Sequence, residues 1–469
     1  MYDAIVIGSG FAGLVAARTI ARANKKVVLL EAQSRLGGRC YTSKDLFPAP
    51  VDLGCSWIHG YAEGTPVRDL VEELGIKATV PQKARSVVIS QGKVLNPEIV
   101  SKLQSNQSKA LEKASKSSGT GSLGAFLFSE HDAAGLFTSL SDEEKRQVEG
   151  LTRTLEIGMG ASLERFSLRW NGYEDSFKGT DAGPEGGYSR VIDALAKSFT
   201  ALGGEIRTGT PVLGVNPGAS GEGVDIHTST GNAESDDLSA RLVICTIPLA
   251  VLQKSHKDLF QAPLSSKKVE AIEKTHVGQL GKIVLSYDQA WWPTDVGAFT
   301  ILPTASPVSK EEAPLKDARA LLNSVSLVTA SFAVESSLTP HPTLLTYLPA
   351  PVAVQLEAMT TAQVTEAIHS LFLDNLPRAA GVKAKRPIVS ELTSWSKDPY
   401  ALGATSTPVI AADEVTPLNF VELGKPEWQG RLLFAGEHTS LNNRGSVTGA
   451  VETGEKEGKR AVRLLNAQT

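Results

Sequence analysis

The sequence predicts an α/β fold that opens with a dinucleotide-binding βαβ unit. Residues 2–7 (YDAIVI) form an apolar, β-branched run typical of a buried strand, and residues 14–24 follow with a helical pattern. Residues 25–31 (KKVVLLE) predict the next strand. The turn between the first strand and the helix, residues 8–13 (GSGFAG), has the glycine spacing of dinucleotide-binding turns.

This glycine turn has a chemical reason at each position. Gly8 permits a tight turn, Gly10 lets a pyrophosphate approach the N–H groups of the helix N-terminus, and Gly13 allows the helix to pack closely on the strand. Glu31 ends the second strand, where its carboxylate can accept hydrogen bonds from ribose hydroxyls. The motif alone leaves NAD and FAD as alternatives.

Strand-rich and helical stretches alternate along the rest of the chain. Residues 36–60 are rich in Gly and lack periodicity, which predicts a long ligand-facing loop. The strands expected between 205 and 245 indicate a small β-meander that returns to the nucleotide-binding fold. Further strands are expected at 279–302, 325–330 and 343–348, and helices at 350–376 and from about Ser446 onward.

Composition and charge argue against several classes of partner. Lys and Arg total 47, Asp and Glu total 51, and no basic stripe is visible, so neither nucleic acid nor a membrane surface is expected as a partner. The purest apolar run, residues 242–252, is far shorter than the ~20 residues that span a membrane. The strand pattern begins at Tyr2, so no leader segment is expected.

The cysteine pattern indicates neither a metal site nor a disulfide framework. The chain has 3 Cys residues, Cys40, Cys55 and Cys245, and their odd number predicts free thiols in a reducing compartment. No Cys/His spacing typical of a metal site occurs in the sequence. The cytosol is therefore the expected location.

A second glycine turn bears on the choice of cofactor. Arg35-Leu36-Gly37-Gly38-Arg39 follows the Glu31 strand, as expected where a diphosphate continues into a larger cofactor than NAD. Further motifs occur in order along the chain: VIGSGFAGL, LLEA, RLGGR, DLGCSWIHG, EGGYSRVIDALA, TPVLGV, ICTIPLAVL, GKIVLSYDQAWW, WSKDPYALGA, LLFAGEHTS and GSVTGAVETG. In these motifs the sequence resembles the flavin-dependent amine oxidases, a family that includes monoamine and polyamine oxidases. The resemblance implies FAD as the cofactor.

The resemblance also implies an architecture. Monoamine and polyamine oxidases have a Rossmann-like FAD-binding lobe of the glutathione reductase type, interleaved with an α+β substrate-binding lobe. The FAD-binding domain is expected at residues 1–80, 205–285 and 390–469, and the substrate-binding domain at residues 81–204 and 286–389. Both are discontinuous because flavin motifs recur at the start, middle and end of the chain.

The family's cofactor-binding roles fall on particular positions of this sequence. The resemblance places the ADP and diphosphate half of FAD at Gly8, Ser9, Gly10, Ala12, Gly13, Glu31, Ala32, Arg35, Gly37, Gly38 and Arg39. The adenine end would also meet the backbone of Val212. The rest of the cofactor would lie against Gly54, Ser56, Trp57, Trp395, Tyr400, Gly436, Glu437, Ser446, Val447 and Thr448. The final helix would direct its N-terminal N–H groups at the flavin ring.

Two residues are expected to act on the reaction itself. Lys282, in the strand pattern LGKIVLSY, matches the flavin-facing lysine of the family, which holds a water at the flavin N5. His59 lies in the string WIHG, which resembles the polyamine oxidase branch, where this His hydrogen-bonds a substrate nitrogen. Taken alone, a strand Lys is typical of a solvated surface and a loop His of a structural role.

Other positions depart from the family's pattern. Ala404 stands where monoamine oxidases attach the flavin through a Cys, which predicts non-covalent FAD. Thr405, a candidate substrate contact, and Ser446-Val447 replace aromatic side chains that flank the amine in other branches. Thr448 stands where polyamine oxidases usually have His.

A polyamine also needs carboxylates that hold its remote ammonium groups. The candidates from loops near the motifs are Glu63, Glu174, Asp175, Asp181 and Glu185, of which Glu63 and Glu185 rank first. A solvated surface acid is the ordinary alternative for each of them.

The resemblance implies oxidation of spermine, spermidine or an acetylated polyamine. Hydride would pass to flavin N5, the imine would hydrolyse to an aldehyde and a shorter amine, and O2 would reoxidise the flavin, giving H2O2. A small amine and O2 are thus the expected partners, and the oligomeric state is left open, with a monomer favoured.

Four alternatives remain at this stage. They are a monoamine oxidase, an L-amino acid oxidase, a nicotinamide-dependent reductase and a flavin-bound protein that mainly binds a partner, with little turnover. An L-amino acid oxidase needs a buried Arg for the substrate carboxylate, and Arg165 and Arg169 are candidates that the sequence does not place.

Overall fold

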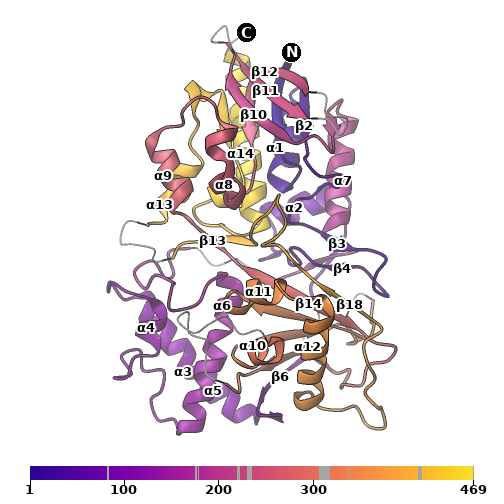
Figure 1. Cartoon of the computed structure of the whole chain (residues 1–469), viewed down its shortest axis with the longest axis vertical. Coiled ribbons are helices and arrows are strands. Elements are labelled where there is room, and N and C mark those ends of the chain that lie inside the picture. Colours follow the sequence, from indigo (N-terminus) through magenta and orange to yellow (C-terminus); the bar gives the residue numbers. More distant parts are fainter. Residues whose placement is uncertain are drawn as a thin grey trace.

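Two seven-stranded sheets organise the chain, one in each half of the elongated molecule drawn in Figure 1. The computed structural model describes residues 1–469 except 82–83, 175–176, 178, 219–221, 230–234, 306–316, 336, 338, 410–414 and 468–469. Candidate Asp175 therefore lies outside the described residues. Within them, the molecule is a mixed α/β protein with several sheets.

The first sheet contains the predicted βαβ opening. β1 (Tyr2–Ile7) pairs in parallel with β2 (Val27–Leu30) on one side and β12 (Ser235–Cys245) on the other. β9 (Glu205–Arg207) extends the sheet beyond β2, and β20 (Leu432–Phe434) pairs with the end of β12, both in parallel. β10 (Val212–Pro217) and β11 (Val224–Ser229) add an antiparallel extension along the first half of β12.

The core of this sheet follows from the alternation of side chains along β1. Ala4 and Val6 point to one face, where they pack with helices α1 (Phe11–Arg22), α7 (Tyr188–Ala201) and α14 (Val447–Ala467). Ile5 and Ile7 point to the opposite face, where they pack with residues of β10, β11 and the helices α8 (Leu249–Leu259), α9 (Ser266–Lys274) and α13 (Leu418–Leu423). Both faces of β1 and β2 are covered, which explains why residues 4–7 and Val27–Leu30 are apolar without alternation.

The second sheet has the order β18-β14-β17-β16-β15-β6-β7. Its strands are β6 (Arg85–Ser90), β7 (Lys93–Val94), β14 (Leu280–Ser286), β15 (Val296–Ile301), β16 (Leu327–Ser331), β17 (Thr343–Pro349) and β18 (Val389–Leu392). Helices α10 (Ala318–Asn323), α11 (Ala350–Glu357) and α12 (Thr361–Asn375) share its core. A further cluster is built by α3 (Pro97–Ser115), α4 (Leu123–Leu127) and α5 (Asp142–Arg153), with α6 (Leu155–Met159) packed against it.

Small elements lie between the sheets or at their edges. They are β3 (Thr42–Ser43) with β4 (Val51–Asp52), β5 (Ala78–Thr79) with β8 (Gly183–Pro184), β13 (His276–Gly278) with β19 (Thr405–Thr407), α2 (Pro66–Glu73), η1 (Trp428–Gly430) and η2 (Glu437–Thr439). Among the described residues, no helix combines the length and apolarity that crossing a membrane requires.

Two local expectations are corrected. The segment 36–60 is not a plain loop, because β3 and β4 pair within it as a short antiparallel hairpin. The meander includes only β10, β11 and β12, since β9 crosses to the far edge of the sheet and pairs with β2. The division into two domains stays a prediction, and all of β14, which the expected boundary at residue 285 would cut, belongs to the second sheet.

Helices α1 and α14, coloured indigo and yellow, lie side by side on the first sheet (Figure 1). Glycines of α14 face α1 at this contact, and a Cβ added at Gly454 would lie 2.4 Å from the carbonyl oxygen of Ala12. The last helix therefore packs directly against the first turn of the first helix. This contact joins the two ends of the described chain at one place.

Candidate active site

The first glycine turn closes tightly at the N-terminus of α1. Gly8 has φ +100°, a backbone conformation that favours glycine, and a Cβ at Gly13 would lie 1.9 Å from the Gly8 carbonyl oxygen. Gly10 differs, because a Cβ there would meet nothing nearer than the Gly37 carbonyl oxygen at 4.0 Å. The helix N-terminus thus faces an open space next to Gly10.

The second glycine turn forms the other side of this space. Gly37 donates its N–H to the carbonyl oxygen of Ser9 at 3.1 Å, and a Cβ at Gly38 would lie 3.7 Å from Gly10 Cα. Arg35 Nη1 donates to the Gly38 carbonyl oxygen at 2.8 Å, so this side chain shapes the turn itself. The two predicted turns are therefore brought together.

Glu31 lies buried behind the first turn. Its Oε2 accepts hydrogen bonds from Ser9 N at 2.9 Å and Ser9 Oγ at 2.5 Å, and its Oε1 accepts one from Gln33 N at 2.8 Å. Ala12 lies in the first turn of α1, and Ala32 follows Glu31 directly. The carboxylate is held in place and keeps lone pairs for further donors such as ribose hydroxyls.

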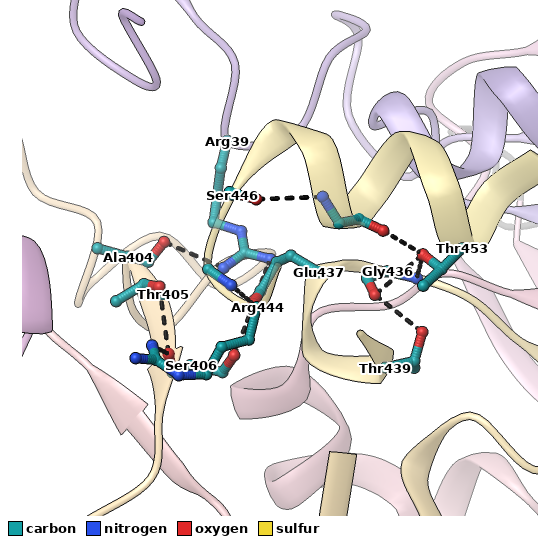
Figure 2. Close-up of polar contacts among 12 residues, drawn as sticks. Arg39, Ala404, Thr405, Ser406, Gly436, Glu437, Thr439, Arg444, Ser446 and Thr453 are labelled. Atoms are coloured by element: carbon teal, nitrogen blue, oxygen red, sulfur yellow. Dashed lines mark hydrogen bonds and ion pairs between the residues drawn. The ribbon is translucent and has the colours of Figure 1, made fainter. Parts of the chain in front are cut away.

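A buried cluster around Glu437 joins segments that are far apart in the sequence (Figure 2). Arg39 reaches it from the second turn, with Nη2 at 3.0 Å from Glu437 Oε1 and Nη1 donating to the Ala404 carbonyl oxygen at 3.0 Å. Glu437 Oε2 accepts hydrogen bonds from Ser406 Oγ at 2.6 Å and Gly445 N at 2.7 Å. Oε1 has the ion pair but no aligned hydrogen bond among the described residues.

The charge of Glu437 is stabilised despite its burial. Burial alone would raise the pKa of the carboxyl, but the Arg39 charge, His438 and the hydrogen bonds from Ser406 and Gly445 outweigh it and lower the pKa below its ordinary value. Burial lowers the pKa of His438 itself to about 4, so this imidazole is neutral at pH 7. The cluster therefore holds one paired carboxylate–guanidinium unit next to the cofactor turns.

The predicted helix start is also built as expected. Ser446 Oγ accepts from Gly449 N at 3.1 Å, which caps α14, while Val447 begins the helix and Thr448 is buried in its first turn. Thr453 Oγ1 accepts from Gly436 N at 3.0 Å, which ties the segment after β20 to α14 (Figure 2).

Lys282 is buried on β14 and its ammonium points into the segment that follows β4. Its Nζ donates to three acceptors, the carbonyl oxygens of Asp52 at 2.9 Å and Gly54 at 2.5 Å, and Ser56 Oγ at 2.6 Å. Burial lowers the pKa of Lys282 to about 8, against the opposing influence of the Asp52 carboxylate. All three N–H bonds are used, so a water bound by this amine has to replace one of these acceptors.

Asp52 completes the surroundings of Lys282. Its Oδ1 accepts hydrogen bonds from Thr42 Oγ1 at 2.5 Å and Tyr188 N at 3.0 Å, and burial nevertheless raises its pKa to about 6. The ring of Tyr347, opposite Lys282 in the β14–β17 pairing, lies 5.4 Å from Nζ. Cross-strand pairing of this kind is not visible in the sequence.

The two predicted tryptophans flank the same segment. Trp57 Nε1 donates to the Tyr347 hydroxyl at 3.3 Å, and Trp395 Nε1 donates to the Leu53 carbonyl oxygen at 3.3 Å. Trp57 is 37% exposed and Tyr400 is 42% exposed, so both present ring surface to a ligand or to solvent. Val212 lies elsewhere, at the start of β10, where it pairs with Thr228.

His59 contacts a carboxylate and an aromatic ring. Its Nδ1 lies 2.9 Å from Asp181 Oδ2, and its ring stacks on Phe177 with centroids 5.3 Å apart. A proton on Nδ1 is donated to Asp181, which leaves Nε2 as the acceptor of the neutral imidazole. Asp181, expected as a binder of ammonium groups, therefore also orients His59.

The other carboxylate candidates differ in their surroundings. Glu63 is exposed, and the exposed Glu185 lies 3.5 Å from Arg190 Nη1. Glu174 forms an ion pair at 2.7 Å with Arg444 Nη2, whose side chain is only 7% exposed, so Glu174 already has a cationic partner. Burial raises the pKa of Glu174.

Arg444 is a residue that the sequence reasoning missed. It donates to the Ser406 carbonyl oxygen at 2.7 Å (Figure 2). It also donates to Tyr173 OH at 3.2 Å and so links the Glu437 cluster to residues 173–174. Thr405 packs against Gly160, Gly278 and Gly445. A Cβ added at any of them would lie within 2.7 Å of the Thr405 side chain. Its three-glycine surroundings were not visible in the sequence because they come from separate segments.

The arginines considered for a substrate carboxylate have other partners. Arg165 Nη2 lies 3.5 Å from His276 Nδ1, and the Arg169 guanidinium lies 5.1 Å from the centre of the Trp170 ring. The buried arginine of the site is Arg444, and its guanidinium already has the Glu174 carboxylate as a partner.

The sequence of this chain matches the model of one protein family over most of its length. The family model described as flavin containing amine oxidoreductase matches residues 11–462. The chain therefore belongs to the flavin-containing amine oxidoreductase family, and FAD is the cofactor of this family. The expected amine oxidase architecture is confirmed at this level, as is a mixed α/β fold with several sheets.

Similar proteins fall into two groups. The chain is 28% identical over 466 residues to Protein FLOWERING LOCUS D from Arabidopsis thaliana, covering 97% of this chain and 54% of that protein. It is 27% identical over 482 residues to Lysine-specific histone demethylase 1 homolog 3 from Oryza sativa subsp. indica, again covering 54% of it. It is 27% identical over 481 residues to Polyamine oxidase 3 from Oryza sativa subsp. japonica, covering 87% of it. The chain thus spans about half the length of the first group.

The residues present fit FAD. The N-terminus of α1 presents its N–H groups beside Gly10, where an added Cβ would meet nothing nearer than 4.0 Å, and Glu31 is fixed by Ser9 of the same turn. Glu437 Oε1, the buried oxygen that pairs with Arg39 at 3.0 Å, accepts no aligned hydrogen bond among the described residues and keeps a lone pair for a further donor. The individual contacts of the predicted residues with the cofactor stay predictions.

Proposed function

We propose that this protein is an FAD-dependent oxidase of polyamines such as spermine, spermidine or an acetylated polyamine. The observation that carries the proposal is His59, which is fixed through Nδ1 by Asp181 and has a half-exposed ring. This arrangement suits an acceptor for a substrate N–H. The WIHG string around it, and similarity to a polyamine oxidase over 87% of that protein's length, support the choice of substrate.

The protein's own residues have to solve a protonation problem. An alkylammonium with a pKa near that of Lys, about 10.4, costs roughly 4–5 kcal/mol to deprotonate at pH 7. His59 Nε2 would accept the proton that the substrate ammonium loses, and Asp181, whose Oδ2 lies 2.9 Å from Nδ1, would stabilise the imidazolium formed by this transfer. Glu63 is an exposed carboxylate that could meet a remote ammonium group, whereas Glu185, also exposed, would have to exchange its pairing with Arg190 for one.

The cofactor half of the site is assigned in the same way. Gly8, Gly10, Gly13, Gly37 and Gly38 would surround the diphosphate in a lobe of the glutathione reductase type. Lys282 fixes the segment 52–56, which would lie along the flavin ring. When bound, FAD supplies two-electron chemistry between the amine and O2. The products would be an aldehyde, a shorter amine and H2O2.

The binding of FAD is proposed to be non-covalent. Ala404 offers no thiol at the position where monoamine oxidases attach the flavin, and its carbonyl oxygen is taken by Arg39. Denaturation and filtration should release all of the yellow colour into the filtrate. We also keep the cytosol as the proposed location.

The test is an anaerobic titration of the purified yellow protein, followed through the flavin absorbance. Spermine, spermidine, acetylated polyamines, monoamines and L-amino acids are added separately. We expect bleaching by one of the polyamines at concentrations that leave the colour unchanged with monoamines and amino acids. Bleaching only by amino acids rejects the polyamine proposal, and a colourless protein that binds NAD rejects the flavin assignment.

The second candidate is oxidation of an N-methylated lysine side chain in a peptide. It is favoured by the 27% identity to a protein named as a lysine-specific histone demethylase, which equals the identity to a polyamine oxidase. A methylated lysine is also a secondary or tertiary amine, and its oxidised N-methyl group would leave as formaldehyde. Bleaching by a dimethyl-lysine peptide, with formaldehyde released in air, and no response to polyamines would favour this candidate.

A further inference from the structure

Two of the three cysteines face each other across the hairpin that supports the site. Cys40 Sγ and Cys55 Sγ lie 2.7 Å apart. The β3–β4 pairing explains why the two sulfurs are close. Thr42 pairs with Asp52, and beyond this pair Cys55 N donates to the Arg39 carbonyl oxygen at 3.3 Å. Both cysteines are free thiols.

Each cysteine is a chain neighbour of a residue in the site. Cys40 follows Arg39, which pairs with Glu437. Cys55 stands between Gly54 and Ser56, which both accept a hydrogen bond from Lys282. A covalent link between the two sulfurs would therefore fasten the turn that carries Arg39 to the segment that holds Lys282.

We propose that Cys40 and Cys55 are a modification site that a peroxide converts into a disulfide. One sulfur attacks the O–O bond of the peroxide, which gives a sulfenic acid and releases water when the peroxide is H2O2. The second sulfur then displaces the sulfenic oxygen, which leaves as a second water, and the S–S bond forms. Both sulfurs are oxidised and the peroxide is reduced. The oxidase reaction proposed above would produce this oxidant, but added H2O2 serves equally well.

The groups around Cys55 affect the rate of this oxidation. Burial, the Cys40 thiol and the Asp52 carboxylate raise the pKa of the Cys55 thiol, while Lys282 acts in the opposite direction. A raised pKa makes the reactive thiolate scarce at neutral pH, so the disulfide forms slowly rather than within a catalytic cycle. Cys245 is the natural comparison, because it is buried on β12 and burial raises its pKa to about 12.

The test counts thiols in the FAD-loaded protein without any amine present. The protein is incubated with H2O2, quenched in denaturant with an alkylating reagent, and analysed as intact protein and as peptides. We expect three labelled thiols before treatment and one after it, a mass lower by two hydrogens for protein without label, and a peptide pair that joins Cys40 to Cys55. Dithiothreitol should restore all three thiols.

Matched variants identify the pair. Cys245→Ser should still lose the mass of two hydrogens, whereas Cys55→Ser should not. Retention of all three thiols after H2O2, a gain of oxygen mass without a cross-link, or a cross-link to Cys245 would each overturn the proposal. Because no amine is used, these outcomes are independent of whether the protein oxidises polyamines.

Discussion

Lys282 places an ammonium group where water cannot reach it freely, and three oxygens of one segment replace that water. The donors point at the Asp52 and Gly54 carbonyls and at Ser56 Oγ, so the lysine organises the backbone next to the proposed flavin ring. A lysine in a strand of alternating residues indicates this only through resemblance to a family. The structure shows why this lysine is needed. Among the described contacts of residues 52–56, its ammonium is the charged group that donates hydrogen bonds to them.

Replacing Lys282 by Met removes these donors and keeps the length of the side chain. We expect amine turnover to fall by about 10²-fold, which is what a misplacement of about 1 Å in an active site can cost. FAD content per chain should stay unchanged, because Arg39, Glu437 and the glycine turns lie on other segments. Stopped-flow bleaching and the ratio of flavin to protein absorbance measure both, and turnover within about two-fold of wild type would contradict the expected role.

Asp181 would act on the proposed substrate through His59. Asp181→Asn keeps the shape but removes the charge that favours a proton on Nδ1, so we expect kcat/KM for the amine to fall by about 10-fold. His59→Ala should lower it further. Asp193→Asn is the matched control, because Asp193 pairs with Lys44 on the surface. Equal kinetics of Asp181→Asn and the control would remove Asp181 from the site.

At the scale of elements, the sequence predicted what local patterns determine. β1, α1 and β2 were expected because their apolar spacing is continuous, and α14 because its cap and glycines are adjacent in the chain. The β3–β4 hairpin was missed because two-residue strands leave no period to detect. The pairing of Lys282 with Tyr347 and the contacts of Arg444 depend on distant segments, so no local pattern could predict them.

The contact between α1 and α14 can be tested with one methyl group. Gly454→Ala would place a Cβ 2.4 Å from the Ala12 carbonyl oxygen, so the helices must separate. We expect a loss of roughly 1–3 kcal/mol in the free energy of unfolding, although alanine favours a helix by about 1 kcal/mol. Gly158→Ala, also in a helix but with nothing within 4 Å of its Cβ, should be neutral or stabilising. Denaturant titration compares them, and equal stability of the two variants would contradict close packing.

At the scale of the whole molecule, a second buried lysine couples stability to pH. Lys268 Nζ donates to the carbonyl oxygens of Leu423 at 2.6 Å and Lys425 at 2.8 Å, and burial lowers its pKa from 10.5 to about 7. Between these two values the unfolded chain binds more protons than the folded one. Stability contributed by this group therefore rises as the pH rises from 7 to 10.5.

Lys268→Met removes this contribution. We compare the free energies of unfolding of wild type and variant. The excess of wild type over the variant should increase by up to a few kcal/mol between pH 7 and 10.5. Lys282 is present in both proteins, so its own titration cancels in the difference. Chemical denaturation at several pH values measures it, and a difference that stays constant or shrinks over this range would show that Lys268 titrates normally.

The meeting of α1 and α14 also has a consequence for how the protein is made. α1 ends at Arg22 and α14 begins at Val447, so a ribosome exposes one wall of the flavin site long before it has translated the other. Contacts between such distant segments form late in folding. FAD binding that needs both helices is therefore expected only after the residues of α14 have been translated.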